Sequence, residues 1–440
     1  MNTIIEPTFI QGEIIAPPSK SLMQRASAAA LIRKGETIIH NVGMSNDDTT
    51  AVQIIQNLGA TVNFFNDTLI INSNGFSSSN IVHNKYINCH ESGLCLRMFT
   101  PIIALHNEAF VINGTGSLLN RPIHFFQEVL PQLNIAVQLN NGLLPLKIKG
   151  SLMPKNIDID ASIGSQFLTG ILFAYASFVQ NDTSCLVKNT SLTIKANNLK
   201  SKQYIDVTLQ VLKDFGLPFP ENNQYETFVF HQHNIPLQHN STLHYTIEND
   251  WSSAAFLLVA GAINGNVVIK NLQPHSLQPD KKIIDVLKNA GANISFQNND
   301  IKITKSSLQP FEFDATHCPD LFPPLVALAA YCNGTSIIKG VHRLTHKESN
   351  RSKTLQEEFA KMGVAISVDN DVMKIVGNKN IQAAEINVHQ DHRIAMATAV
   401  AALQANGKTT IHHSEVVQKS YPMFFKHLQQ LGANLQESFS

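Results

Sequence analysis

Cysteine is scarce in this chain of 440 residues, which has five cysteines and no Cys-x-x-Cys pair. An odd number without paired spacing argues against a disulfide framework and against structural zinc, so ordinary buried or half-buried thiols are expected. Long apolar runs are also missing, since none approaches the roughly 18 residues that a membrane span needs. The first 15 residues contain no basic segment followed by an apolar core. We therefore expect neither secretion nor membrane insertion, and predict a cytoplasmic protein.

An excess of charge of either sign is absent as well. Lys plus Arg and Asp plus Glu each number 33. A broad basic field of the kind that nucleic-acid-binding proteins carry is therefore excluded, and any cationic site must be local. With 440 residues, 43% of them hydrophobic, the chain is long enough for two or three domains with full cores.

What the chain does contain is a repeat that occurs six times. Each copy has an Ala-rich apolar helix, a strand such as Thr335–Lys339, and a second helix that stops at Gly or Asn, as a left-handed C-cap requires. The stops recur roughly every 70 to 80 residues, at Gly59, Asn134, Gly216, Gly291, Gly363 and Gly432. The first helices are predicted at residues 21–32, 94–105, 165–178, 252–263, 321–332 and 392–403.

Six copies are compatible with a closed ring, a solenoid or two lobes of three. Solenoid repeats are shorter, at roughly 20 to 50 residues, and do not carry charged residues at a fixed point of every copy. Two lobes are therefore favoured. The polar stretch 238–242 separates the third copy from the fourth and is the best internal boundary. A strand-like piece at residues 13–16, ended by Pro17 and Pro18, precedes the first copy and fits either lobe.

Polar residues collect at two points of each copy, the N-terminus of the first helix and the N-terminus of the second. Helix N-termini present N–H groups without helical partners and a partial positive charge, so several that converge would form an anion site. The residues at the first point are Lys20, Ser21, Ser92, Gly93, Ser165, Gln166, Asp250, Asp320, Asp391, His392 and Arg393. Those at the second are Asp48, Arg121, Ser201, Lys347, Glu348, Arg351 and Lys419. This pattern indicates a protein that binds small, multiply anionic ligands.

The same residues, in order along essentially the whole chain, resemble the motifs of the 5-enolpyruvylshikimate-3-phosphate (EPSP) synthase family. Each match is weak singly, but together the matches are very specific. They are Pro18, Ser19, Lys20, Ser21, Arg25, Asp47, Asp48, Gly93, Arg97, Arg121, Pro122, Ser165, Gln166, Phe167, Ser201, Tyr204, Asp250, Pro319, Asp320, Lys347, Glu348, Arg351, Asp391, His392, Arg393 and Lys419.

The fold that this resemblance implies is α/β (α+β), with two lobes of three βαβαββ units each. The family places its active site in the interlobe cleft, and its lobes close over the substrates. Residues 21–241 would form the N-terminal lobe, and residues 1–20 plus 242–440 the C-terminal lobe.

The reaction that the resemblance implies transfers the enolpyruvyl group of phosphoenolpyruvate to the 5-hydroxyl of shikimate 3-phosphate, through a tetrahedral adduct that loses phosphate. It needs a base for the hydroxyl and an acid for C3. The residues carried over are Asp320 as base and Glu348 as acid, with Lys20 near the hydroxyl and the leaving phosphate. No metal or organic cofactor is implied. We expect a monomer whose partners are these two small molecules, with no nucleic acid or membrane.

Arg grips carboxylates and phosphates with two parallel hydrogen bonds, whereas Lys acts as a mobile point charge, so both suit substrates that carry several negative charges. By resemblance, the shikimate 3-phosphate set is Lys20, Ser21, Arg25, Ser165, Gln166, Ser201, Tyr204, Asp320 and Lys347. The phosphoenolpyruvate set is Lys20, Gly93, Arg121, Gln166, Arg351, Arg393 and Lys419.

Several of these positions have a plainer interpretation in isolation. An Asp before a helix, such as Asp250 or Asp320, is more often an N-cap than a catalytic residue, and for Asp250 we keep that interpretation. The Pro-Ser-Lys-Ser run lacks the full phosphate-loop pattern, which disfavours nucleotide triphosphates. Residues 113–117 are better explained as a tight turn than as a dinucleotide fingerprint. His412 and His413, adjacent on an expected strand, would point to opposite faces, which disfavours a metal site.

The chain departs from the family pattern at three places near the expected site. Glu91 stands two residues before Gly93, and we expect its side chain to point away or to pair with a cation. Gly164 replaces a common Ser and removes a hydroxyl donor, and Asn350 replaces a common Asp. These changes are expected to affect the sensitivity to inhibitors more than the class of reaction. Glyphosate, which competes with phosphoenolpyruvate in the family, is hypothesised to bind more weakly if Leu94 shifts the helix start.

Three other functions stay open as alternatives. A UDP-N-acetylglucosamine 1-carboxyvinyltransferase shares the fold and the donor, but its usual Lys-Asn pair is Lys20-Ser21 here, and no Cys lies in a comparable Gly-rich loop. An RNA-phosphate cyclase would need a basic surface, which the balanced charge does not support. A non-catalytic anion-binding repeat protein is disfavoured because the charged residues of the motifs are intact. These are Lys20, Arg121, Asp320, Glu348, Arg351, Arg393 and Lys419.

Overall fold

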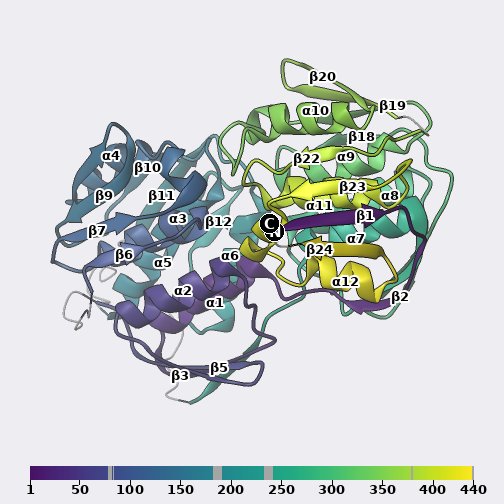
Figure 1. Ribbon diagram of the computed structural model, residues 1–440. Coiled ribbons are helices and arrows are strands. Elements are labelled where there is room, and N and C mark those ends of the chain that lie inside the picture. Colours follow the sequence, from purple (N-terminus) through teal and green to yellow (C-terminus); the bar gives the residue numbers. More distant parts are fainter. Residues whose placement is uncertain (78–81, 83, 182–190, 232–240, 378–379, 439–440) are drawn as a thin grey trace. The chain divides into compact units, whose positions relative to one another are not determined.

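The structure is a computed structural model that describes residues 1–77, 82, 84–181, 191–231, 241–377 and 380–438. The chain divides into two compact units, coloured along the sequence in Figure 1. We call Lys20–Ile247 the N-lobe, and Met1–Ser19 together with Glu248–Ser440 the C-lobe. Within the described residues the strands form six four-stranded sheets, of which each lobe contains three.

The N-lobe consists of three units that repeat one order of strands and helices, with 3-10 helices labelled η. The first unit contains α1 (Lys20–Ile32), β3 (Lys34–His40), α2 (Asn46–Asn57), β4 (Thr61–Phe65), β5 (Thr68–Asn74) and β14 (Leu243–Thr246). The second contains β6 (Tyr86–Asn88), α3 (Gly93–Ile103), β7 (Phe110–Asn113), η1 (Gly116–Asn120), α4 (Phe125–Val129), η2 (Leu130–Leu133), β8 (Ala136–Asn140) and β9 (Leu143–Lys149). The third contains β10 (Ile157–Asp160), α5 (Ser165–Asn181), β11 (Leu192–Asn197), α6 (Gln203–Asp214), β12 (Glu221–Asn223) and β13 (Thr227–Phe230).

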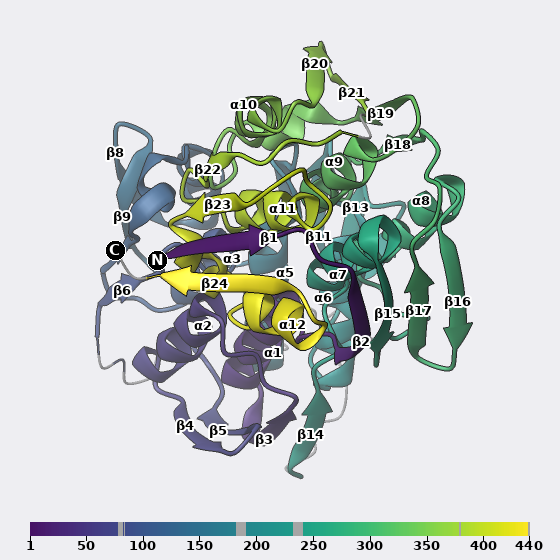
Figure 2. The same cartoon turned by 45° about the vertical axis from the view of Figure 1, so that its right-hand side comes forward.

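The C-lobe repeats the same order (Figure 2). Its first unit contains β2 (Ile10–Ile15), α7 (Trp251–Asn264), β15 (Gly265–Lys270), η5 (Pro279–Lys282), α8 (Ile283–Asn289), β16 (Asn293–Gln297) and β17 (Asp300–Thr304). The second contains β18 (Glu312–Asp314), η6 (Pro319–Leu321), α9 (Phe322–Ala330), β19 (Thr335–Lys339), η7 (Val341–Leu344), α10 (Arg351–Lys361), β20 (Ala365–Asp369) and β21 (Val372–Val376). The third contains β22 (Glu385–Asn387), α11 (His392–Ala402), β23 (Thr409–His412), η8 (Ser414–Lys419), α12 (Phe424–Gln430), β24 (Asn434–Ser438) and β1 (Asn2–Glu6).

Each unit combines a parallel pair of strands with antiparallel partners. In the second unit, for example, β6 runs parallel to β7, β9 lies antiparallel to β7, and β8 lies antiparallel to β9. Helix α3 forms the crossover between the parallel strands, as a parallel connection requires. The repeated pattern of two helices and four strands confirms the mixed α/β fold that was predicted.

The six predicted helix stops are confirmed by their backbone angles. Gly59, Asn134, Gly216, Gly291, Gly363 and Gly432 all have positive φ, from 64° at Asn134 and Gly216 to 102° at Gly59. Left-handed backbone ends a helix because it redirects the chain, and Gly and Asn adopt it at least cost. The six predicted first helices are confirmed as α1, α3, α5, α7, α9 and α11. For the fifth, residues 319–321 form η6 and the α-helix begins at Phe322.

Strands that are distant in sequence complete both lobes. Strand β14 pairs in parallel with β3, which places residues 243–246 in the N-lobe, so the division falls at 247/248 rather than at 241/242. Residues 238–240 of the expected boundary lie outside the described residues. The strand-like piece at 13–16 is the end of β2, which pairs in parallel with β15 in the C-lobe. Strand β1, which sequence analysis did not predict, lies between β23 and β24.

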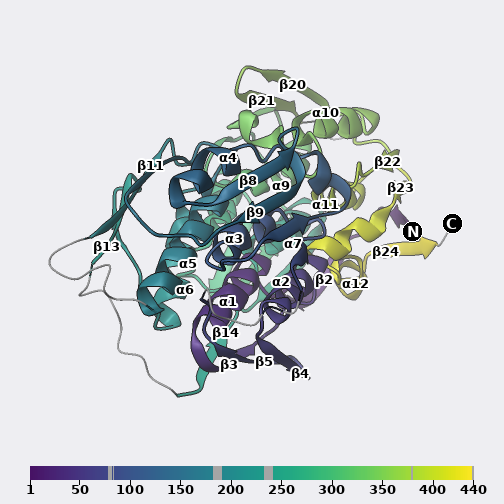
Figure 3. The same ribbon diagram turned by 90° about the vertical axis from the view of Figure 1, so that its left-hand side faces the viewer.

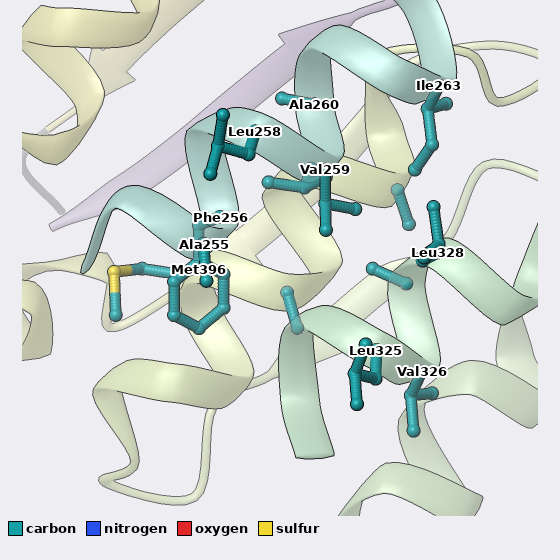
Figure 4. Packing of buried hydrophobic residues seen from close by; sticks show 14 of the residues in the cluster. Ala255, Phe256, Leu258, Val259, Ala260, Ile263, Leu325, Val326, Leu328 and Met396 are labelled. Atoms are coloured by element: carbon teal, nitrogen blue, oxygen red, sulfur yellow. The ribbon is translucent and has the colours of Figure 1, made fainter. Parts of the chain in front are cut away.

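The first helices of the units form the centre of each lobe. In the C-lobe, α7, α9 and α11 pack together through apolar side chains, including Val259, Leu328 and Met396 (Figure 4). Every residue of α7 is buried, which explains why this helix is apolar all round. In the N-lobe, α1, α3 and α5 occupy the corresponding position, with strands of the three sheets outside them (Figure 3). Most of the predicted site residues lie at the ends of helices or in the adjoining loops.

Candidate functional site

The first residue of α1 begins the charged site of the N-lobe. Lys20 places its Nζ 2.8 Å from Oδ2 of Asp47, in the first turn of α2. The two side chains are 19% and 7% exposed, so the pair is largely screened from water. A lysine at a helix N-terminus can exchange a carboxylate partner for an anionic ligand. Its charge is then paired both before and after the ligand binds.

Two guanidinium groups meet at the first residue of α3. A Cβ built on Gly93 would lie 2.8 Å from Nη1 of Arg97 and 2.9 Å from Nη1 of Arg121. Arg97 also donates from Nη1 to Oε1 of Gln166, at 3.3 Å, and to the carbonyl of Gly93, at 3.1 Å. Both arginines are buried, with 7% and 6% exposure. Two like charges beside a helix N-terminus form a strong anion site, in which only Gly leaves the guanidinium groups this close to the backbone.

Arg97 belongs to the family motifs, but sequence analysis assigned it no role. Its position in the helix Gly93–Ile103, among apolar residues, marks it as a buried charge. A buried Arg needs a partner or a ligand, and this requirement was the signal that could have identified it.

A second group of predicted N-lobe residues surrounds Arg25. Its Nε donates to Oγ1 of Thr208 at 3.0 Å, and its Nη1 donates to the carbonyl of Ser21 at 2.9 Å. The guanidinium carbon lies 5.7 Å from the centre of the Tyr204 ring. Burial lowers the pKa of Arg25 to about 10, so it remains charged at neutral pH. The structure thus brings Ser21, Arg25 and Tyr204 together, as predicted for a phosphate-bearing ligand.

The remaining N-lobe predictions lie at helix starts. Ser165 is the first residue of α5 and is buried, and Gln166 follows it. Ser201, which precedes α6, has a left-handed φ of 57° and is 5% exposed. Backbone of this kind costs free energy in a residue with a side chain and often occurs at functional sites.

The C-lobe contains a denser network of charges, centred on Arg351, the first residue of α10. Its Nε donates to Oδ2 of Asp391 at 2.8 Å, and its Nη1 donates to Oδ1 of Asp320 at 2.9 Å. Its Nη2 bonds Oε2 of Glu348 and Oδ1 of Asp391, the latter at 3.2 Å. Arg351 and Asp391 are buried at 1% and 0% exposure. The acids raise the pKa of Arg351 and outweigh the opposing effect of burial.

Asp320 in η6 is surrounded by three cations. Oδ1 lies 3.2 Å from Nζ of Lys347 as well as close to Arg351, and Oδ2 lies 3.2 Å from Nη2 of Arg393. Burial alone would raise the pKa of this carboxyl, but Arg393, Lys347 and Arg351 hold it well below its usual value. Asp320 is therefore a carboxylate at neutral pH. It does not cap α9, which corrects the plainer of its two interpretations.

Glu348 and Lys419 complete the predicted C-lobe set. Glu348 bonds Arg351 through Oε2, while its Oε1 lies 3.8 Å from Nζ of Lys419. Lys419, the last residue of η8, is 5% exposed. All six predicted C-lobe residues therefore belong to one network: Asp320, Lys347, Glu348, Arg351, Arg393 and Lys419.

Asp280 is a further acid near this network that sequence analysis missed. It lies in η5, at 1% exposure, and burial together with the Asp320 carboxylate raises its pKa to about 6. Its run, Gln-Pro-Asp-Lys-Lys, has the composition of an exposed helix start, so no local signal distinguishes it.

Other positions match or correct the sequence predictions. Asp250 caps α7, since its Oδ1 accepts from the Ser252 amide at 3.2 Å. The carboxyl group of Glu91 packs against Gly116, the left-handed first residue of η1. His412 ends β23, whereas His413 has a φ of 55° and lies outside the strand, so the expected alternation of the two rings does not apply.

Two observations concern metal ligands and cysteines in the described part of the chain. None of its His, Cys, Asp and Glu side chains form a group of three or more that could hold a metal ion. Its four cysteines, Cys89, Cys95, Cys318 and Cys332, are free and buried, as expected. No helix in the described ranges has the length and apolar character needed to cross a membrane.

Asp48, next to the Lys20–Asp47 pair, should make stability depend on pH. Its Oδ2 accepts from the amide and hydroxyl of Ser45 in a capping box, and burial raises its pKa to about 7. A raised carboxyl pKa contributes stability that is full below the unfolded value of about 4 and is lost as pH rises through about 7. Asp48→Asn keeps the acceptor but cannot ionise. We expect it to gain on the order of 4 kcal/mol relative to wild type between pH 4 and pH 8, at about 1.4 kcal/mol for each pH unit between the two pKa values.

Thermal or urea unfolding of wild type and Asp48→Asn across this pH range measures the difference. Asp67→Asn, at an exposed acid of the same lobe, serves as the control. A difference between wild type and Asp48→Asn that does not change with pH would contradict the raised pKa.

The fold and the two charged sites define an enolpyruvyl transferase architecture. An EPSP synthase structure from Acinetobacter baumannii superimposes with a TM-score of 0.78 at 23% identity and covers 99% of both chains. An enolpyruvyl transferase from Streptomyces tendae superimposes with a TM-score of 0.73 at 17% identity, over 100% of this chain and 99% of that one. At these identities the likeness establishes the fold alone.

The chain belongs to the EPSP synthase (3-phosphoshikimate 1-carboxyvinyltransferase) family, whose model matches residues 4–428. The 3-phosphoshikimate 1-carboxyvinyltransferase of Clostridium acetobutylicum is 36% identical over 442 residues and covers 99% of both sequences. The protein of the same name from Clostridium perfringens strain 13 is 34% identical over 436 residues, again with 99% of both covered.

Proposed function

We propose that this protein transfers the enolpyruvyl group of phosphoenolpyruvate to the 5-hydroxyl of shikimate 3-phosphate. The observation that carries the proposal is the Asp320 network, in which one carboxylate is held by Lys347, Arg351 and Arg393 in a chain of this family. Three cations around one acid can exchange it for the phosphate and carboxylate of the substrates. Family membership over nearly the whole chain supports the reaction.

In the first step, the 5-hydroxyl oxygen bonds to C2 of phosphoenolpyruvate, Asp320 accepts the hydroxyl proton, and Glu348 supplies a proton to C3. The product is a tetrahedral adduct. In the second step, Glu348 takes a proton back from C3, the C2–O bond to phosphate breaks, and Asp320 returns its proton to the leaving phosphate, with Lys20 nearby. Acid and base exchange roles between the steps, so each residue ends in its starting state.

The substrate contacts are proposed from the two predicted sets. Phosphoenolpyruvate contacts Lys20, Gly93, Arg121, Gln166, Arg351, Arg393 and Lys419. Shikimate 3-phosphate contacts Lys20, Ser21, Arg25, Ser165, Gln166, Ser201, Tyr204, Asp320 and Lys347. The guanidinium pair at Gly93 supports the first assignment, and the Arg25–Tyr204 contact supports the second. We further propose that the protein acts in the cytoplasm as a monomer.

Phosphate release from the purified protein tests this function. The reaction contains phosphoenolpyruvate with shikimate 3-phosphate, with UDP-N-acetylglucosamine, or with no acceptor. We expect release with shikimate 3-phosphate alone. Release only with the sugar nucleotide would change the acceptor, and no release with either would favour an anion-binding protein without catalysis.

Gly93→Ala should weaken the binding of phosphoenolpyruvate. The new methyl group would lie within 3 Å of Nη1 of both Arg97 and Arg121 and would displace their guanidinium groups. Loss of hydrogen bonds to a charged group predicts a KM for phosphoenolpyruvate raised about 10- to 100-fold. Steady-state kinetics measure it, with the KM for shikimate 3-phosphate as the internal control. An unchanged KM for phosphoenolpyruvate would contradict the proposed contact.

We also propose that glyphosate competes with phosphoenolpyruvate and that Leu94 weakens its binding. Leu94 lies in the first turn of α3, next to Gly93, and is 8% exposed. Leu94→Thr is expected to lower the glyphosate concentration for half-inhibition severalfold, while the KM for phosphoenolpyruvate changes less. Inhibition titrations of both proteins measure this, and equal sensitivity would refute the hypothesis about Leu94.

A further inference from the structure

Helix α10 contacts the loop of residues 388–391 through two charged residues, and only one of them belongs to the proposed site. Arg351, in its first turn, binds Asp391 at the end of this loop. Glu358, seven residues later and on the same face, binds the Asn387 amide at the end of β22 and the His389 side chain near the beginning of the loop. Both are 1% exposed. The loop joins β22 to α11 and leads to Arg393, so α10 contacts both ends of the segment that presents this arginine.

The contacts of Glu358 are specific and short. Its Oε2 accepts from the Asn387 amide at 3.0 Å and from Nζ of Lys361 at 2.7 Å. Its Oε1 lies 2.9 Å from Nε2 of His389, which donates because a carboxylate can only accept. A buried carboxylate with three donors is well satisfied, and its removal would leave the Asn387 amide at the end of β22 and the His389 ring without this partner.

The loop has an unfavourable backbone that needs support. His389 and Gln390 are consecutive residues with φ of 49° and 57°, in the left-handed region that residues with side chains rarely adopt. The Asn387 side chain accepts from the His389 amide at 3.1 Å, and the Asp391 amide donates to the Val388 carbonyl at 2.8 Å. Strained backbone persists only where surrounding contacts hold it, and Glu358 supplies two of those contacts.

The end of the loop carries the proposed chemistry. Asp391 caps α11 by accepting from the Arg393 amide at 3.0 Å and also binds Arg351. Arg393 reaches Asp320 from the first turn of α11. A loop that relaxed toward ordinary backbone angles would move Asp391, and with it the partners of Arg351 and the start of the helix that carries Arg393.

We propose that Glu358 is a positioning residue for the enolpyruvyl transfer, which fixes the left-handed turn at His389 and Gln390 so that Asp391 and Arg393 are held in place. This role rests on the proposed function, since Arg351 and Arg393 are assigned there to phosphoenolpyruvate. It predicts a selective effect on the binding of that substrate. A loss of overall stability alone would instead reduce the amount of active enzyme and leave both KM values unchanged.

Steady-state kinetics of Glu358→Ala and Glu358→Gln test the proposal. Glu358→Ala is expected to raise the KM for phosphoenolpyruvate at least about tenfold, with the KM for shikimate 3-phosphate within about twofold of wild type. Glu358→Gln keeps one acceptor for the Asn387 amide and should give an intermediate KM even if the alanine variant folds poorly. Glu357→Gln is the matched control, because this neighbour is exposed and pairs only at 3.5 Å with Lys353.

Turnover by the wild-type protein tests the proposed function separately. With an active wild type, unchanged KM values in both Glu358 variants, or equal rises for both substrates, would overturn the positioning role alone. The positioning role would be supported by a KM for phosphoenolpyruvate in Glu358→Gln that lies between those of wild type and Glu358→Ala, together with unchanged KM values in Glu357→Gln.

Discussion

Replacement of Asp320 by alanine is expected to lower turnover by about 10²- to 10⁴-fold, the usual contribution of a positioned general base. Asp320 is a carboxylate at neutral pH because three cations surround it. Anionic substrates would compete for Arg351, Arg393 and Lys347, and a carboxylate that loses cationic partners becomes more basic. The residue would therefore be a weak base in the free protein and a stronger one once the substrates have bound.

Glu348→Ala should cause a loss of similar size, since it removes the proposed acid. Turnover is measured with saturating phosphoenolpyruvate and shikimate 3-phosphate, and binding of shikimate 3-phosphate is measured separately by titration. Glu312→Gln is the control, because this acid lies exposed on β18 and pairs with Lys339. Near-normal turnover in Asp320→Ala or Glu348→Ala would show that the acid and base are assigned wrongly.

Replacement of Arg351 by methionine should produce the largest loss of stability. It removes the guanidinium partner of Asp391, which is 0% exposed, and one partner each of Glu348 and Asp320. Removal of one side of a buried ion pair costs about 3–5 kcal/mol, because the remaining charge stays buried without compensation. The free energy of unfolding from urea titration at pH 7 should fall by that amount.

Two further variants separate charge from packing in this experiment. Arg351→Met combined with Asp391→Asn should recover part of the loss, because it also removes the uncompensated charge. Lys353→Met, on the exposed face of the same helix, should change stability by less than about 0.5 kcal/mol. Equal stability of Arg351→Met and Lys353→Met would mean that the network contributes little to folding.

The helices could be predicted from the sequence because their signals are local. Apolar helices with polar first turns and Gly or Asn stops are short-range patterns, and Gly and Asn are the residues that adopt left-handed angles at helix ends such as Gly59 and Asn134 at least cost. Strand pairing was not predictable in the same way. Residues 243–246 pair with β3, about 200 positions earlier in the chain, and nothing within either segment specifies the other.

The same difference between local and long-range signals decides which site residues could be predicted. Residues with motif neighbours, such as Lys20 and Arg351, were identified from the sequence and have buried ionic partners in the structure. Asp280 and Glu358 were missed because their sequence surroundings are those of solvated helix turns, and only tertiary packing buries them. A buried acid on a polar helix face changes neither the composition nor the hydrophobic periodicity of the sequence. Its burial and its partners can therefore be recognised only in the structure.

The position of β1 between β23 and β24 has a consequence for synthesis of the chain. The N-lobe is continuous from Lys20 to Ile247 and can fold as soon as that stretch has left the ribosome. Residues 1–19 must wait for partners as late as residues 434–438, which at ribosomal rates is a delay of roughly 20 to 80 seconds. The two strands within residues 1–19 therefore stay without their sheet partners until after the N-lobe has been synthesised, and completion of this lobe depends on β24.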